Sequence, residues 1–163
     1  MASKKRPALR VAEVRAAYGR DAFVLDASVA VKWYVPHEAD AGKALWVWRQ
    51  FESGALDLAA PFLLQLELAN ALRYLPGSSR EWAGGRIAAF SRLSLSWHVP
   101  DPRLMEAASD LVWAHGVEIY DAFYLALAQR LSTRLLTADE KFIKKVGNHP
   151  LLMPLRTLVI PTE

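Results

Sequence analysis

Four carboxylates stand out because of the residues around them. Two of them directly follow short strand-like stretches, one lies inside a mostly apolar helical segment, and one begins a mostly apolar segment. Hard oxygen ligands favour Mg²⁺ or Mn²⁺ over zinc. If the four converged, they would repel one another and raise one another's pKa values unless a cation neutralised them. These candidate metal ligands and catalytic residues are Asp26, Glu67, Asp121 and Asp139.

Each carboxylate also has an ordinary structural interpretation. Asp26, Asp121 and Asp139 stand where each could cap a helix, which is a common use of aspartate. Glu67 is different, because a lone carboxylate in an apolar helix is costly to bury unless it is paired or bound to metal. The alternative for Glu67 is a narrow polar stripe facing water. The metal-site hypothesis therefore rests on the set of four.

Such a cluster suits phosphodiester hydrolysis. Mg²⁺ keeps several water ligands and takes few protein carboxylates, which leaves positions for a phosphate oxygen and a nucleophilic water. One metal would activate the water, and a second could stabilise the leaving oxygen. The histidines share no short spacing and are interpreted as surface or capping residues.

Alternating strand-like and helical segments must position the carboxylates. This alternation predicts a parallel sheet with helices on both faces, with sites beyond the carboxyl ends of the strands. Pro61 is expected to open a helix, Asp101 to cap one, and Gly147 to end one. The predicted strands are 22–26, 56–60, 95–99, 134–137 and one within 155–160; the predicted helices are 38–53, 61–75, 79–93, 102–116, 121–131 and 139–146.

Length and charge bound the organisation of the chain. Its 163 residues suit one domain, and its formal net charge is +3. The basic excess lies in residues 1–20, so we divide the chain into a basic N-terminal arm (1–20) and a nuclease-like domain (21–163). The arm is predicted to bind phosphates or to be a solvated tail, and an Arg-rich organelle-targeting peptide is a more remote alternative. The sequence has no cysteine, no signal peptide and no apolar run long enough to span a bilayer, which predicts a cytoplasmic protein.

Four segments, in this order, resemble the motifs of PIN-domain nucleases, specifically the VapC-type toxins of prokaryotic toxin–antitoxin pairs. They are residues 24–33, 61–72, 120–128 and 135–139. The resemblance extends over about residues 23–159 and leaves the first 20 residues unexplained.

This resemblance implies a three-layer α/β/α sandwich with a mainly parallel central sheet and Mg²⁺- or Mn²⁺-dependent endoribonuclease activity. By position, the four carboxylates take the family's acidic places. Ser28 and Thr137 match polar positions that orient the first and last carboxylates, and Asn70 matches a polar neighbour of the glutamate. The resemblance also implies a homodimer and inhibition by a VapB-type antitoxin.

Other residues are assigned weaker roles. Glu118 is a candidate second-shell or substitute carboxylate beside Asp121. The tentative RNA-binding residues are Lys32, Arg73, Lys144 and Lys145, for which solvated surface is the alternative. Among the tryptophans, core packing is expected for Trp33, Trp97 and Trp113, whereas Trp46 and Trp48 could line the core, a homodimer contact or an antitoxin groove.

Two other functions stay open. A metal-dependent phosphohydrolase or DNA nuclease could use a similar sheet, but the phosphohydrolase would need a second Asp where Ser28 stands. A catalytically inactive PIN-like binding module is the other alternative, and the four intact carboxylates count against it.

Overall fold

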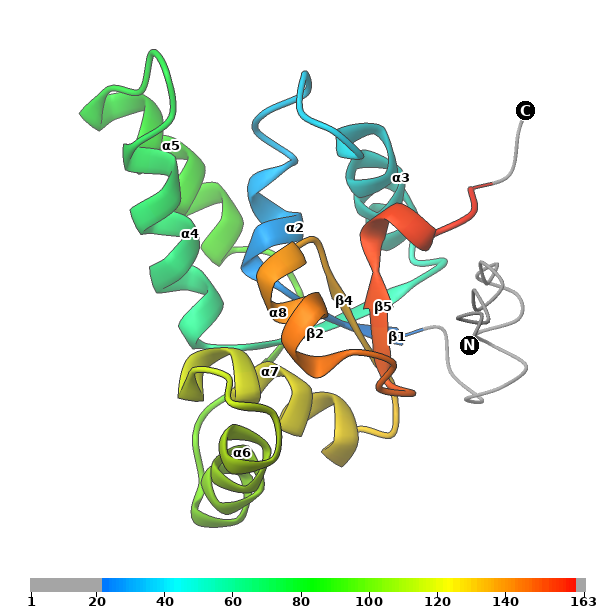
Figure 1. The fold of residues 1–163 in the computed structure, drawn as a ribbon. Helices are drawn as coiled ribbons and strands as arrows, with labels where there is room; N and C mark the ends of the chain where they lie inside the picture. Colours follow the sequence, from blue (N-terminus) through cyan, green and yellow to red (C-terminus); the bar gives the residue numbers. More distant parts are fainter. Residues whose placement is uncertain (1–21, 161–163) are drawn as a thin grey trace.

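A five-stranded sheet forms the centre of the protein in a computed structural model that describes residues 22–160 (Figure 1). The predicted basic arm lies outside the described residues. Every strand pairing is parallel, and the strand order is β3-β2-β1-β4-β5. The strands are β1 (Ala22–Leu25), β2 (Asp57–Pro61), β3 (Ser96–His98), β4 (Arg134–Thr137) and β5 (Leu152–Pro154).

Helices cover both faces of this sheet, which confirms the predicted three-layer α/β/α architecture. Helix α7 packs against β1, β2 and β4 with α6 outside it, while α2 and α3 lie on the opposite face (Figure 1). No helix of the described part of the chain is long and apolar enough to cross a bilayer. The helices are α2 (Ala27–Val31), α3 (Ala41–Glu52), α4 (Leu63–Arg73), α5 (Arg80–Ser91), α6 (Pro102–His115), α7 (Ile119–Arg130), α8 (Glu140–Val146) and the short 3-10 helix η1 (Leu155–Thr157).

Strand β1 lies at the middle of the sheet because its side chains are apolar on both faces. Phe23, Val24 and Leu25 are fully buried, as expected for a strand covered by helices on both sides. Leu25 is in register with Leu136 of β4. This register brings the carboxyl ends of the two strands together, and the backbone N–H of Asp26 donates to the carbonyl oxygen of Leu136 at 3.1 Å.

Two of the predicted boundaries that are wrong involve proline. Pro61 ends β2 in register with His98, and α4 begins only at Leu63. The last strand is β5, which lies before the predicted range and ends at Pro154. A proline cannot donate to the next rung of a sheet, so it is tolerated at these strand ends. The chain then turns into η1, where the Thr157 hydroxyl donates to the Pro154 carbonyl at 2.7 Å.

The tryptophans divide differently from the prediction. Trp33 packs against the core, and its indole N–H donates to the carbonyl oxygen of Ala44 at 2.9 Å. Trp97 also packs against the core, near Phe90. Trp113 does not, because it is 87% exposed. Helix α6 buries the face that carries Leu104, Ala108 and Leu111, and Trp113 lies on the opposite side of that helix.

Candidate metal centre

Asp26 is held by two hydroxyl groups where β1 ends. Ser28 Oγ donates to Asp26 Oδ2 at 2.6 Å, and Thr137 Oγ1 donates to the same oxygen. Asp26 precedes α2, but its side chain makes no capping hydrogen bond there. Asp26 is therefore the N-cap residue of α2 by position, but its side chain does not cap the helix. Oδ2 of Asp26 is thus fixed by two hydroxyl groups, and the backbone of Ala27 also contacts this carboxylate.

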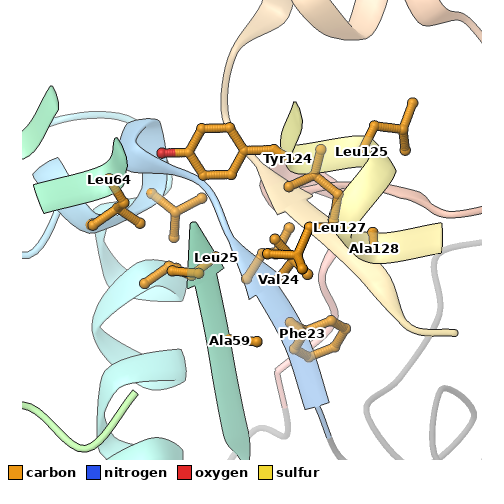
Figure 2. Packing of buried hydrophobic residues seen from close by; sticks show 14 of the residues in the cluster. Phe23, Val24, Leu25, Ala59, Leu64, Tyr124, Leu125, Leu127 and Ala128 are labelled. Carbon is orange, nitrogen blue, oxygen red and sulfur yellow. The ribbon is translucent and has the colours of Figure 1, made fainter. Parts of the chain in front are cut away.

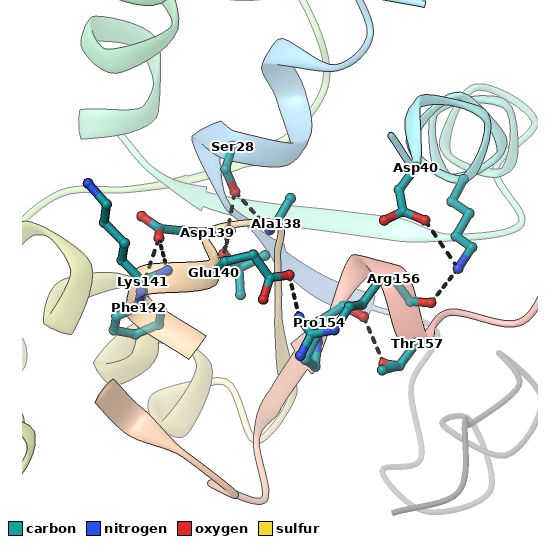
Figure 3. A network of polar contacts seen from close by, with 12 residues as sticks. Ser28, Asp40, Ala138, Asp139, Glu140, Lys141, Phe142, Pro154, Arg156 and Thr157 are labelled. Carbon is teal, nitrogen blue, oxygen red and sulfur yellow. Dashed lines mark hydrogen bonds and ion pairs between the residues drawn. The ribbon is translucent and has the colours of Figure 1, made fainter. Parts of the chain in front are cut away.

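The two hydroxyl groups are themselves fixed by the loop after β4. The backbone N–H of Ala138 donates to Ser28 Oγ at 2.8 Å (Figure 3), and that of Asp139 donates to Thr137 Oγ1 at 3.1 Å. Each hydroxyl accepts from the backbone and donates to Asp26. The structure thus places Ser28 and Thr137 where they can orient the Asp26 carboxylate.

Asp139 serves as the cap of α8, as one of its interpretations predicted. Its Oδ1 accepts from the backbone N–H groups of Lys141 at 2.8 Å and Phe142 at 3.0 Å (Figure 3). This arrangement fixes the side chain at the carboxyl end of β4, next to the end of β1. Capping occupies one oxygen, so it leaves Oδ2 available and does not exclude a role as a ligand.

Glu67 and Asp121 come from two helices that flank these strand ends. Glu67 lies on α4, whose buried face is Leu64, Leu68 and Leu72. Asp121 is in the first turn of α7, where the N-cap residue is Glu118. The interpretation of Asp121 as the N-cap residue is therefore wrong, and its carboxylate does not cap α7.

The pKa values show that the four carboxylates lie close enough to affect one another. Burial raises the pKa of Glu67 to about 7. The charges of Asp26 and Asp121 also raise this pKa, whereas the hydrogen bond from Tyr124 lowers it. Burial also raises the pKa of Asp121 to about 6, with added repulsion from Asp26, Asp139 and Glu118. The pKa of Asp26 is raised by burial and by Asp139, although the two hydroxyl groups oppose the rise. The cluster therefore carries repulsion that a cation would relieve.

The donor set fits a hard divalent cation. Asp26, Asp121 and Asp139 line one small pocket together with Tyr124, Leu135 and Phe142. Within residues 22–160, however, no three acidic or histidine side chains are placed closely enough to hold one ion as they stand. Their carboxylate oxygens are nevertheless the kind of ligand that Mg²⁺ and Mn²⁺ prefer.

The remaining residues predicted around the carboxylates have distinct positions. Glu118 is exposed, and its charge raises the pKa of Asp121. Asn70 is exposed on α4, one turn after Glu67. The structure thus brings Glu118 into electrostatic contact with the cluster and leaves Asn70 at the surface of the same helix.

Two of the four predicted RNA-binding residues are already engaged. Lys32 pairs with Glu38 at 3.0 Å, and Arg73 lies over the ring of Tyr74 at 4.5 Å. Lys144 and Lys145 are exposed on α8, and the charge of Lys145 lowers the pKa of Asp121. Of the four predicted residues, Lys144 and Lys145 are therefore the best placed to contact a substrate.

Tyr124 is a site residue that was not predicted from the sequence. This residue lies on α7, one turn after Asp121, and its hydroxyl donates to Glu67 Oε2. Its side chain is only 2% exposed. The available signal was a tyrosine inside the otherwise apolar segment 122–128, because a buried tyrosine hydroxyl usually finds a hydrogen-bond partner.

A separate aromatic groove lies between α3, α5 and the segment after α2. It has a volume of about 570 Å³. Trp48, one of the two predicted groove residues, lines it, with its ring 4.7 Å from that of Trp33. Trp46 instead packs against the core. The groove is lined by Trp33, Tyr34, Leu45, Trp48, Trp82, Arg86, Ala89, Phe90 and Leu93.

Comparisons with known proteins agree with this fold. The sequence model of the PIN domain matches residues 23–148. A protein of Pyrobaculum aerophilum named ribonuclease VapC3 is 32% identical over 129 residues, which cover 75% of this chain and 92% of the relative. Ribonuclease VapC1 of Mycobacterium tuberculosis is 37% identical over 91 residues, covering 54% of this chain and 67% of the relative.

A solved structure is similar in fold. It is a chain of a toxin–antitoxin complex from Klebsiella pneumoniae, with a TM-score of 0.60 and 16% sequence identity over 82% of this chain and 97% of that chain. The parallel sheet, its helical layers and the match over residues 23–148 show that the chain belongs to the PIN-domain family. Within that family, the likeness to the Pyrobaculum protein over most of both chains places it with the VapC-type members.

Proposed function

We propose that this chain is the toxin of a VapBC-type module and hydrolyses RNA phosphodiester bonds with Mg²⁺ or Mn²⁺. The ligands are Asp26, Glu67, Asp121 and Asp139. The ribonuclease names of the two relatives support the reaction class. An enzyme of this kind acts where cellular RNA is found, so we place it in the cytoplasm.

One observation carries this proposal. Asp26, Asp121 and Asp139 line the same pocket, and Glu67 is coupled electrostatically to two of them. A protein gains no stability from gathering carboxylates that raise one another's pKa values. Such perturbed groups in a pocket are typical of functional sites. The cluster is better explained by a bound cation than by any role in folding.

The chain's own residues define what happens at this site. Ser28 and Thr137 fix Asp26 Oδ2, and the start of α8 fixes Asp139 Oδ1, so the carboxylates of both aspartates are held in place. Such preorganised ligands position the reactants without further rearrangement. When bound, Mg²⁺ or Mn²⁺ would neutralise the carboxylates, polarise a phosphate oxygen and lower the pKa of a water nucleophile.

The exposed lysines of α8 are the best-supported contacts to the RNA backbone. Lys141, Lys144 and Lys145 share the solvent side of this helix, whose other face buries Phe142 and Val146. Glu140 pairs with Arg156 and so does not neutralise them. Changing Lys144 and Lys145 together to alanine should flatten the salt dependence of RNA binding, while Arg103→Ala on α6 should leave it unchanged.

The alternative reactions are less well supported. A phosphohydrolase would need a second carboxylate two residues after Asp26, and here Ser28 instead donates to Asp26 and accepts from Ala138. A binding module without catalysis gives no reason for the carboxylate cluster.

Cleavage of single-stranded RNA by the purified chain tests the proposal. We expect cleavage with Mg²⁺ or Mn²⁺ and none after chelation. Asp26→Asn and Asp121→Asn should each lower the rate by at least about 100-fold, because each change removes a ligand charge. Circular dichroism should show that both variants stay folded. Absence of metal-dependent cleavage of any RNA or DNA, together with undetectable Mn²⁺ binding, would contradict the proposal.

We also propose that the aromatic groove receives a segment of the antitoxin. Its lining is aromatic and aliphatic except for Arg86, whose guanidinium lies 5.7 Å from the ring centre of Trp82. This combination suits an apolar segment with one acidic side chain, because aromatic pockets with a single charge favour such anchors.

The antitoxin proposal is tested on surface residues that folding does not require. Arg86→Glu should weaken binding of the cognate VapB-type antitoxin by about tenfold or more, through charge reversal. Arg92→Glu, an exposed change at the end of the same helix, is the matched control. If calorimetry gave the two variants equal affinities for the antitoxin, the antitoxin would bind outside the aromatic groove.

We also propose that the protein forms a homodimer, as its resemblance to VapC-type proteins implies. Helix α4 and the residue before it expose Phe62 (48%) and Leu66 (62%), which would suit such a contact. Light scattering should give a dimer for the wild type and a monomer for Leu66→Glu. A wild-type monomer at high concentration would contradict this proposal.

A further inference from the structure

Tyr124 joins the two helices that carry Glu67 and Asp121. It lies on α7, and in Figure 2 its ring points away from that helix with the hydroxyl group at the far end, toward the segment around Leu64. Its hydroxyl donates to Glu67 Oε2, on α4. The contact crosses 57 residues of sequence, so it is a tertiary hydrogen bond between two elements of the site.

The hydroxyl group of Tyr124 meets the Glu67 carboxylate and the backbone N–H of Ala27. Its side chain is 2% exposed and packs within the hydrophobic core. A buried hydroxyl group loses free energy unless it is hydrogen-bonded. The group to which it donates is one oxygen of a candidate metal ligand, and the other oxygen, Oε1, is left unconstrained by this bond.

Glu67 needs such a constraint more than the three aspartates do. Glutamate has one more rotatable bond than aspartate and loses more conformational freedom when it is fixed. Asp26 is fixed by two hydroxyl groups and Asp139 by two backbone N–H groups. For Glu67, the hydrogen bond from Tyr124 plays the corresponding part.

The donor also keeps its proton. A tyrosine hydroxyl has an ordinary pKa of about 10, so it is protonated near neutral pH. A tyrosine in this position stays neutral across the working pH range, so it can always donate to the carboxylate. It contributes no charge that would compete with the cation.

We infer that Tyr124 is a positioning residue, which holds the Glu67 carboxylate so that its free oxygen faces the metal ion. The inference rests on the proposed metal site. Hydrogen-bond partners of metal ligands typically change metal affinity by about 10–100-fold when they are removed. The role belongs to the hydroxyl group, because the ring alone would fill the core equally well as phenylalanine.

Direct Mn²⁺ binding, followed by electron paramagnetic resonance, tests the inference without relying on activity. Tyr124→Phe should weaken Mn²⁺ binding by about tenfold or more while it leaves the circular dichroism spectrum unchanged. RNA cleavage by this variant should recover toward the wild-type rate at saturating Mn²⁺. Tyr120→Phe is the matched control, because Tyr120 is on the same helix but 61% exposed. It should bind Mn²⁺ like the wild type.

A double-mutant cycle separates positioning from a general structural effect. In the Glu67→Gln background, Tyr124→Phe should change Mn²⁺ affinity by less than about twofold, because the carboxylate that it positions is gone. The same further loss in both backgrounds would overturn the inference, and so would wild-type-like binding by Tyr124→Phe alone. If the wild type itself bound no Mn²⁺, the proposed metal site would fail first, and the inference would fall with it.

Discussion

At the scale of single residues, the site is defined by which oxygen of each carboxylate the protein already uses. Asp26 Oδ2 accepts from Ser28 and Thr137, Asp139 Oδ1 caps α8, and Glu67 Oε2 accepts from Tyr124. In these three of the four carboxylates, the protein holds a named oxygen in place. This common pattern is what distinguishes a prepared ligand set from an accidental gathering of acids.

Thr137→Val tests the pattern at one hydroxyl group. Valine keeps the shape of this fully buried side chain but removes the donor to Asp26 and the acceptor for the Asp139 N–H. We expect Mn²⁺ affinity to fall by about tenfold and stability to fall by about 1–3 kcal/mol, because a buried partner is lost. Calorimetric titration and urea unfolding measure the two effects.

Thr157→Val is the control for Thr137→Val. It also removes a hydroxyl hydrogen bond, at 2.7 Å to Pro154, but one that involves none of the carboxylates. It should leave Mn²⁺ affinity unchanged. Equal Mn²⁺ affinities in the two valine variants would show that the Thr137 hydroxyl does not orient Asp26.

Sequence reasoning reached some of these residue-scale features and missed others. Asp26 and Asp139 could be placed together, because parallel strands end at the same edge and both follow a strand-like stretch. Their roles as free or capping side chains could not be assigned, since capping depends on where a helix begins. For Asp121 that start is Ile119, two residues earlier than predicted. Tyr124 was missed because its partner lies on a distant helix.

At the scale of elements, α4 must hold Glu67 against the strand ends. Its buried face carries Leu64, Leu68 and Leu72 at helical spacing, and it packs on α2 and β2. Asp26 immediately precedes α2. The packing of this one helix therefore sets the position of Glu67 relative to Asp26.

Leu68→Ala tests the role of α4. Leu68 is 1% exposed and adjacent to Glu67, so a cavity there should cost about 2–5 kcal/mol and loosen the helix. Asn70→Ala, on the exposed face of the same helix, should change stability by less than about 0.5 kcal/mol. The free energy of unfolding in urea distinguishes the two. Similar losses in both variants would mean that α4 is not anchored by this face.

The sequence predicted least well the helix and strand boundaries that depend on tertiary contacts. The helix expected at Pro61 begins later because Phe62 still donates to the carbonyl oxygen of His98 at 2.8 Å, extending the sheet contact. Trp113 was expected in the core. Its place on α6 is outward, and composition alone cannot reveal which face of a helix is covered.

At the scale of the whole molecule, the cluster makes stability depend on pH and on metal. Glu67 and Asp121 have folded-state pKa values of about 7 and about 6. A raised carboxylate pKa means that the folded state holds the proton more tightly than the unfolded state. The resulting stability is fully present below about pH 4, the unfolded value, and is lost as pH rises through 6 and 7.

Metal-free protein should therefore melt at a lower temperature at pH 8 than at pH 5, by roughly 3 °C or more. Excess Mg²⁺ or Mn²⁺ should restore the melting temperature at pH 8, because it binds only the folded state. The Glu67→Gln, Asp121→Asn double variant should lose most of this pH dependence. Comparison with it cancels other titrating groups, such as His98, whose pKa is lowered by burial. A metal-free melting temperature that rose over this range would contradict the account.

The central claim, that four carboxylates form one divalent-metal site, is tested most directly by Mn²⁺ binding. Electron paramagnetic resonance should follow Mn²⁺ titrations of the wild type and of Asp26→Asn, Glu67→Gln, Asp121→Asn and Asp139→Asn, with Asp110→Asn as an exposed control on α6. The account predicts that the control binds like the wild type and that each of the four variants binds at least about tenfold more weakly. Unchanged affinity in the four variants, or no binding by the wild type, would contradict it.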